Sequence, residues 1–250
     1  MSTWITMAFV VSEIPDTEGA GGYHHGHLRD TLLRYGIELA RSGGPEAVSI
    51  RAVQRLARVS NAAAYRHYAD RYALLQAISD HASRCMADAM TDAIDAAGEG
   101  DTPADAARAR FRASGAAYLN FALTEPGLFA IAFLTDLPSK DPANPRPGAR
   151  NAAGLGPFQL LQRCVDELEA TGALSTETKP FTDIAAWSAV HGLAVLINHG
   201  PLAQLPQAAR HSAINRLLQI IEDGLETAAR HGDSVAPPTS PGGRQTRAGR

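Results

Sequence analysis

The sequence predicts an all-α protein with a small N-terminal helical domain and a larger helical domain behind it. Three observations predict this class. Alanine is used heavily and β-branched residues are sparse, which favours helices over strands. Apolar residues recur three or four positions apart along most of the chain. The segments between these patterns are rich in glycine and proline, and we find no convincing strand and no internal repeat.

Composition and charge narrow the class further. Hydrophobic residues make up 45 % of the 250 residues and charged residues 20 %, which is typical of a globular protein. No apolar run approaches the roughly 18 residues that span a bilayer, and residues 1–11 lack the pattern of a signal peptide. We therefore expect a cytoplasmic protein without a membrane partner. In that compartment Cys85 and Cys164 are expected to be buried, reduced thiols.

The N-terminal elements begin after a weakly patterned arm, residues 1–22. A first helix is predicted from His27 to Ser42, where Gly43, Gly44 and Pro45 stop it. Ser49 is a candidate N-cap for a short second helix. Its apolar residues are expected to point inward: Ile50, Val53, Leu56 and Ala57.

A third helix is predicted from Ser60 or Asn61, either of which can cap it, to about Tyr68. Val59 is expected to fill the angle between this helix and the second one. Asp70 then caps a longer fourth helix that runs to about residue 97. Two short helices joined by a tight connection, with a further helix behind them, are typical of a helix-turn-helix, which projects its second helix into a DNA major groove.

The remaining helices are predicted at five segments: 103–123, 126–134, 155–171, 180–199 and 206–230. The segment 137–157 is rich in proline and glycine and is expected to be a loop. The expected organisation is thus an arm (1–22), a helix-turn-helix domain (23–72), a helical ligand-sensing and dimerisation domain (73–230) and a disordered tail (231–250).

The charge distribution supports DNA binding by residues 23–72. This segment holds eight arginines against four acidic residues, although the whole chain has a formal net charge of −3. In the third helix, Asn61 suits a bidentate contact to adenine, and Ala62 and Ala63 suit thymine methyl groups. Tyr68 is expected in the core. The full set of expected DNA contacts, most of them to phosphates, is Ser49, Arg51, Ser60, Asn61, Ala62, Ala63, Tyr65, Arg66, His67 and Arg71.

These residues resemble the TetR family of bacterial regulators. The resemblance is carried by residues 23–29, 49–51, 59–60 and 64–75. A second match, Trp187 to Gly192, resembles the Trp-His-Gly signature of one C-terminal domain type in that family. The resemblance implies a homodimer on a near-palindromic DNA operator, usually a repressor that a small-molecule effector releases.

Two residues depart from the family pattern. Arg58 stands where the family usually has a turn glycine, and Gln54 stands where it has a small alanine. A residue other than glycine held at positive φ costs about 1 kcal/mol. We expect Gln54 to loosen the packing of the second helix, and Arg58 is a further candidate for a phosphate contact.

The histidines at positions 24, 25 and 27 suggest two interpretations. As a metal site they lack a fourth ligand and have a glycine among them, so the favoured interpretation is a weakly basic arm along the DNA backbone. No metal and no cofactor is expected.

Aromatic residues of the C-terminal domain are the candidate walls of a ligand pocket. They are Phe111, Tyr118, Phe121, Phe129, Phe133, Trp187 and His191, although any one such residue is more often simple core than a ligand contact. Trp187 and His191 are four residues apart and share a helix face, so they either line a pocket or brace neighbouring helices with Gly192 allowing close approach.

The last two helices carry apolar stripes that suit a four-helix dimer interface, as the resemblance implies, or an intramolecular core. The stripes are Ile184, Trp187, His191, Ala194 and Val195 on one helix, and Ile214, Leu217, Leu218, Ile221 and Leu225 on the other. No catalytic motif is found, and neither cysteine has an obvious histidine partner, so no enzyme is expected. The alternative function is a helical ligand-binding or interaction protein that does not bind specific DNA.

Overall fold

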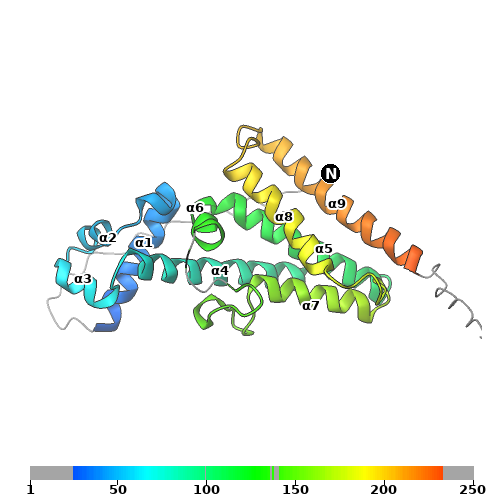
Figure 1. The fold of residues 1–250 in the computed structure, drawn as a ribbon, viewed down its shortest axis with the longest axis horizontal. Helices are drawn as coiled ribbons and strands as arrows, with labels where there is room; N and C mark the ends of the chain where they lie inside the picture. Colours follow the sequence, from blue (N-terminus) through cyan, green and yellow to red (C-terminus); the bar gives the residue numbers. More distant parts are fainter. Residues whose placement is uncertain (1–24, 99, 136, 138–140, 233–250) are drawn as a thin grey trace, which may run out of the picture.

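The computed structural model describes residues 25–98, 100–135, 137 and 141–232, and in these residues it contains helices and no strand (Figure 1). The predicted all-α class is therefore confirmed. The predicted arm (1–22) and the tail beyond residue 232 lie outside the described residues. The elements are α1 (His25–Ala47), α2 (Ile50–Leu56), α3 (Asn61–His67), α4 (Arg71–Ala96), α5 (Pro103–Thr124), α6 (Pro126–Phe129), the π-helical turn η1 (Ala130–Leu134), the 3-10 turn η2 (Pro147–Ala149), α7 (Pro157–Ala170), α8 (Thr182–Asn198) and α9 (Gln207–Gly232).

Side-chain caps start the helices of the N-terminal domain where the sequence predicts them. Ser49 Oγ accepts a hydrogen bond from Ala52 N, and Ser60 Oγ accepts one from Ala63 N, each at 3.2 Å. Asp70 Oδ1 accepts one from the backbone N–H three residues later at 2.7 Å and starts α4. These bonds satisfy N–H groups that have no partner within the helix. The helix predicted from His27 loses helical geometry at Gly43 and Gly44, as expected.

One inward position of the N-terminal domain was predicted wrongly. Ile50 and Val53 are buried, but Leu56 is 45 % exposed. Leu56 is six residues after Ile50, which places the two side chains about 120° apart around the helix axis. Leu56 therefore does not share the buried face of Ile50.

The long helix α4 connects the small domain to the body, where it packs along α5 (Figure 1). On its other sides α5 contacts α7, α8 and α9, so it is the central helix of the body. Side chains of α5, α7 and α8 form a separate buried cluster that contains Cys164. Both cysteines are free, as predicted, although Cys85 is only half-buried.

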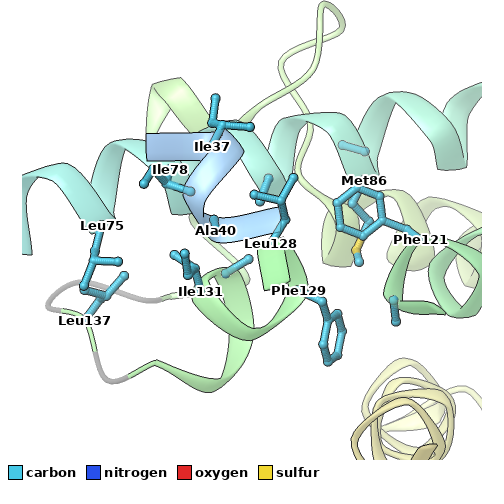
Figure 2. Close-up of a cluster of buried hydrophobic side chains, with 14 of the residues drawn as sticks. Ile37, Ala40, Leu75, Ile78, Met86, Phe121, Leu128, Phe129, Ile131 and Leu137 are labelled. Carbon is cyan, nitrogen blue, oxygen red and sulfur yellow. The ribbon is translucent and has the colours of Figure 1, made fainter. Parts of the chain in front are cut away.

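The segment predicted as one helix over 126–134 is a single turn of α-helix, α6, followed by η1. The wider turn is closed by a hydrogen bond from Thr135 N to Ala130 O at 2.9 Å. Leu128, Phe129 and Ile131 are fully buried in this segment, against Ile37 and Ala40 of α1 and Ile78 of α4 (Figure 2). The segment thus sits between the small domain and the body.

Among the described residues, no single helix is long and apolar enough to cross a membrane. Residues 103–124 and 126–133 pass that test only as a pair, and the chain bends by 105° between them.

Candidate nucleic-acid interface and ligand cavity

Helix α3 has one face in the core and an opposite face in solvent. Ala64 and Tyr68 are buried at its inner side, and the Tyr68 hydroxyl donates to Arg29 O at 3.4 Å, so the predicted core role of Tyr68 is confirmed. Burial raises the pKa of this hydroxyl. The predicted DNA-contacting residues occupy the remaining surface: Asn61, Ala62, Tyr65 and Arg66 are exposed, and Ala63 and His67 are half-buried.

The predicted phosphate contacts flank α3, and some of them also have structural roles. Arg51 is exposed on α2, whereas Ser49 and Ser60 use their hydroxyl oxygens as caps. Arg71 is half-buried, and its guanidinium donates to Pro45 O at 2.6 Å and to Val48 O at 2.8 Å. It therefore holds the connection between α1 and α2. Sequence reasoning missed this role because the partners lie 23 and 26 residues away.

The body contains a partly open cavity of about 230 Å³ between α4, α5, η1, α7, α8 and α9. Five of the seven predicted aromatic wall residues line it: Phe111, Tyr118, Phe133, Trp187 and His191. The other two do not, because both lie in the core beside α1 and α4 (Figure 2). Phe121, three residues after Tyr118, lies beside Met86 in the core (Figure 2), and Phe129 packs beside Phe133 with ring centroids 5.1 Å apart.

The two residues of the Trp-His pair both line the cavity and contact other rings. His191 Nδ1 lies 2.8 Å from the Tyr118 hydroxyl on α5, and Trp187 packs between His191 at 5.6 Å and Phe158 at 5.4 Å. Burial lowers the pKa of His191 and raises that of Tyr118, so both are neutral at pH 7. The pair thus braces α8 against α5 while one side of it faces the cavity.

The segment 141–149, predicted only as part of a loop, forms another part of the cavity wall. Arg146 Nε lies 3.2 Å from Asp80 Oδ2 on α4, and the same carboxylate accepts from Gln76 Nε2 at 3.0 Å. Arg84 donates to Gly148 O at 2.7 Å. These contacts fix the loop on α4. The sequence carries no local pattern for them, since Asp80 and Arg146 are 66 residues apart.

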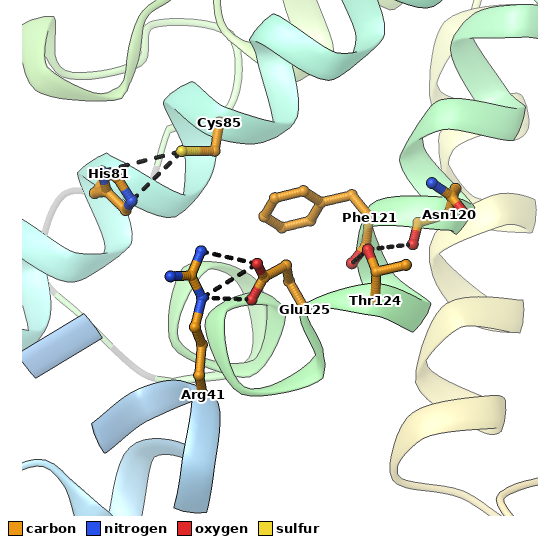
Figure 3. Close-up of polar contacts among 7 residues, drawn as sticks. All are labelled: Arg41, His81, Cys85, Asn120, Phe121, Thr124 and Glu125. Atoms are coloured by element: carbon orange, nitrogen blue, oxygen red, sulfur yellow. Dashed lines mark hydrogen bonds and ion pairs between the residues drawn. The ribbon is translucent and has the colours of Figure 1, made fainter. Parts of the chain in front are cut away.

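The segment α6–η1 connects the cavity to α1. At its far end, Ala132 and Phe133 line the cavity. At its near end, a β-carbon added at Gly127 would lie 1.9 Å from Ala40 O, so the two backbones are in direct contact. Beside them, Arg41 Nη2 and Nε donate to both carboxylate oxygens of Glu125 at 2.8 and 2.9 Å, which raises the pKa of Arg41 (Figure 3).

A histidine does accompany Cys85, contrary to the sequence-based expectation. His81, one turn earlier on α4, places Nε2 at 3.4 Å from Cys85 Sγ (Figure 3). Burial raises the pKa of the Cys85 thiol, which disfavours the nucleophilic thiolate, and burial together with Arg84 lowers the pKa of His81. Burial also raises the pKa of Cys164 to about 11. Within the described residues, no three His, Cys, Asp or Glu side chains are grouped to hold a metal ion, and His24 lies outside them.

Two family models match the two domains described above. Residues 32–78 match bacterial regulatory proteins of the tetR family, and residues 111–221 match a tetracyclin repressor-like C-terminal domain. The chain belongs to the TetR family. It is a DNA-binding transcriptional regulator, and not a helical ligand-binding or interaction protein without specific DNA binding.

Three solved structures are similar to this TetR family protein. A protein of unknown function from Rhodococcus sp. RHA1 is 28 % identical, with 82 % of this chain and 98 % of that one covered and a TM-score of 0.63. A protein assigned as a regulator, SCO4313, is 15 % identical over 79 % and 96 % of the chains, with a TM-score of 0.53. A protein assigned as a tetR family transcription regulator from Shewanella sp. PV-4 is 18 % identical over 76 % and 95 %, with a TM-score of 0.49. No match is found among curated proteins.

The turn of this TetR family protein contains the strained residue that the sequence predicts. Arg58 has φ 54°, in the left-handed region, and its side chain is exposed. The Gln54 side chain points inward instead, and its Oε1 is the one buried side-chain oxygen or nitrogen without a hydrogen-bond partner in the described part of the chain. An unpartnered buried acceptor costs stability, which agrees with the expectation that Gln54 loosens this region.

Replacing Arg58 with glycine is expected to raise the free energy of unfolding by about 1 kcal/mol, because glycine adopts positive φ without steric cost. Arg55→Gly, in the last turn of α2 where the backbone is helical, is the matched control and should lower stability by about 1 kcal/mol. Thermal and urea denaturation measure both changes. A lower stability of Arg58→Gly than of wild type would contradict the assigned turn geometry.

Three of the ten residues in the predicted dimer stripes of this regulator are buried within one protomer, and most of the others are half-buried. Ala194, Ile214 and Leu218 are 1 %, 8 % and 4 % exposed, because they pack in the core between α5, α8 and α9. Trp187, His191, Leu218 and Ile221 line the cavity. Ile184, which belongs to the predicted stripe, is 48 % exposed, and two apolar residues outside the stripes, Leu196 on α8 and Ile220 on α9, are 42 % and 52 % exposed.

Proposed function

We propose that this regulator is a homodimeric repressor in the cytoplasm, which binds a near-palindromic operator and leaves it when a small molecule enters the body cavity. The observation that carries the proposal is the continuous segment α6–η1, which contacts the cavity at one end and α1 at the other. No catalytic role and no cofactor is part of it.

The exposed face of α3 is the proposed reader of the operator. Asn61, Ala62 and Ala63 occupy its first turn and would face base edges, where small side chains allow close approach. Tyr65, Arg66 and His67 would contact the backbone or base edges, with Arg51, Arg71 and the caps Ser49 and Ser60 at neighbouring phosphates. This assignment follows from exposure and from the basic charge of the domain.

The proposed release starts at η1. A molecule that fills the cavity presses on Ala132 and Phe133 and displaces the buried segment of which they are part. Since Gly127 touches the backbone of Ala40 and Glu125 is bonded to Arg41, a shift of this segment moves α1. Operator half-sites lie roughly one helical turn apart, and the two recognition helices must match that spacing, so a small movement lowers affinity.

The proposed dimer forms through α8 and α9. A β-carbon added at Gly192, within α8, would meet no atom within 4 Å, so nothing in the protomer requires glycine there. Glycine inside a helix costs about 1 kcal/mol relative to alanine. Close approach of a partner helix would account for it, and exposed Ile184 and Leu196 on the same helix would supply apolar contacts.

Selection of genomic DNA fragments with the purified protein tests the regulator as a whole. Tyr65→Ala and His67→Ala are expected to weaken binding to every fragment, whereas Asn61→Ala is expected to reduce discrimination between bases by roughly tenfold or more. Ala69→Ser, exposed just beyond α3, is a control that should bind like wild type. Equal binding by all three variants and wild type would contradict the assignment of α3.

A further inference from the structure

The cavity wall contains a hydrogen-bond donor for which the described residues provide no acceptor. The buried Tyr118 hydroxyl needs an acceptor for its proton, and His191 Nδ1 lies 2.8 Å from it. The indole of Trp187 also forms a hydrogen bond with this hydroxyl, and an indole N–H can only donate, so it cannot accept the Tyr118 proton. Tyr118 O–H therefore donates to His191 Nδ1. In the neutral imidazole the remaining proton then sits on Nε2, which makes that nitrogen a donor.

No partner for His191 Nε2 is found among the described residues, and His191 lines the cavity. The neutral form of the ring is maintained because burial lowers the pKa of His191 and no charged group opposes that effect. Tyr118, Phe133 and Trp187 surround the imidazole, with ring centroids 6.3, 6.1 and 5.6 Å away. The donor is therefore set in an aromatic wall.

Charged groups lie in another part of the cavity and are already occupied or exposed. The Asp80 carboxylate is bonded to Arg146 and Gln76, and Arg146 and Asp141 are exposed on the loop. An ionised ligand group beside His191 and the three aromatic rings around it would have no opposite charge nearby. Removing such a group from water would therefore be costly. A neutral polar group costs far less and gains a bond to Nε2.

We propose that the effector is a neutral, mostly apolar molecule of one or two rings that carries a hydrogen-bond acceptor such as a ketone or ester oxygen, bound by His191 Nε2–H. The size follows from the cavity of about 230 Å³, since a cavity of about 150 Å³ holds benzene. The inference rests on the proposed function, because it takes this cavity as the effector site.

The test compares acetophenone with α-methylstyrene, which has nearly the same shape but a CH₂ group in place of the carbonyl oxygen. Their dissociation constants are measured by calorimetry at pH 7 on the full chain without DNA. The double variant Tyr118→Phe/His191→Leu removes the donor and leaves no hydroxyl unpaired. The preference for acetophenone relative to α-methylstyrene is expected to fall by roughly threefold to tenfold in this variant. Because each protein binds both compounds, their different hydrophobicity cancels.

A conservative variant separates a specific hydrogen bond from a change of cavity shape. Tyr118→Phe/His191→Gln places an amide N–H near the position of Nε2 and should retain most of the wild-type preference. An unchanged preference in Tyr118→Phe/His191→Leu would overturn the proposal. So would tighter binding of benzoate or benzylammonium than of acetophenone, or no binding of acetophenone up to its solubility limit. Circular dichroism confirms that each variant is folded.

Operator affinity in the presence of acetophenone is a separate measurement. If the compound binds with the expected preference and operator affinity does not change, the proposed release mechanism fails and the ligand class stands. If operator binding by the protein is normal and the preference is absent, the ligand class fails alone.

Discussion

Gly127→Ala is expected to lower the free energy of unfolding by about 3 kcal/mol and to weaken operator binding in the protein that remains folded. The added β-carbon would lie 1.9 Å from Ala40 O and 2.9 Å from Ala40 C. Both are backbone atoms, so no side-chain rotation relieves the clash and α6 must move away from α1. That movement resembles the one proposed for the effector, and the variant should therefore bind the operator as poorly as the effector-bound protein.

The matched control for this substitution is Gly36→Ala. A β-carbon at Gly36 would meet Ile78 Cδ1 at 2.9 Å and Leu74 Cδ1 at 3.3 Å, which are the ends of flexible side chains. Small rotations can relieve these contacts, and alanine favours the helix, so the change in stability should stay within about 1 kcal/mol. Urea denaturation and a DNA-binding titration measure both variants. Equal behaviour of the two glycine variants would show that the contact between α6 and α1 transmits nothing.

Gly192→Leu is expected to give a folded monomer with operator affinity reduced by roughly 10²-fold to 10⁴-fold. A β-carbon at Gly192 would meet no atom of the protomer within 4 Å, so the variant is expected to fold, but the leucine side chain would prevent close approach of a second α8. A monomer reads one half-site and loses the high effective concentration that links the two halves of a dimer. Light scattering after gel filtration gives the oligomeric state, and a titration of operator DNA gives the affinity.

Ala89→Leu serves as the control for the leucine substitution. Ala89 is exposed on α4, which lies on the other side of α5 from α8 and α9 (Figure 1). This variant should remain dimeric and bind the operator like wild type. A dimeric Gly192→Leu protein with normal operator affinity would place the interface on another face.

Features that depend on nearby residues were predicted well from the sequence. Ser49, Ser60 and Asp70 each accept a bond from a backbone N–H three residues later, so the residue type and its position in the pattern are sufficient. The positive φ of Arg58 follows in the same way from the short turn and from the family pattern.

Several features that depend on distant residues were not predicted. Tyr118 and Phe121 lie on one helix, and only the packing of α1, α4 and α6 decides that Tyr118 lines the cavity and Phe121 does not. The structural role of Arg71 and the loop wall held by Arg146 both depend on contacts between segments far apart in the chain. An apolar stripe shows that a helix face is covered and does not show which chain covers it, as Ile214 and Leu218 illustrate.

The residues that line most of the cavity differ from those that contact α1, and this separation matters for how ligand specificity can change. The contact with α1 is made by Glu125, Gly127 and the buried apolar residues of α6 and η1, whereas much of the cavity wall belongs to α7, α8 and the segment 141–149. In the proposed mechanism, substitutions in Phe158, Leu161 or Pro145 would therefore alter which molecules fit without touching Glu125 or Gly127. If the proposed release is confirmed, the protein would be a suitable starting point for a biosensor, in which a library directed at those walls changes the molecule detected and the reporter promoter stays the same.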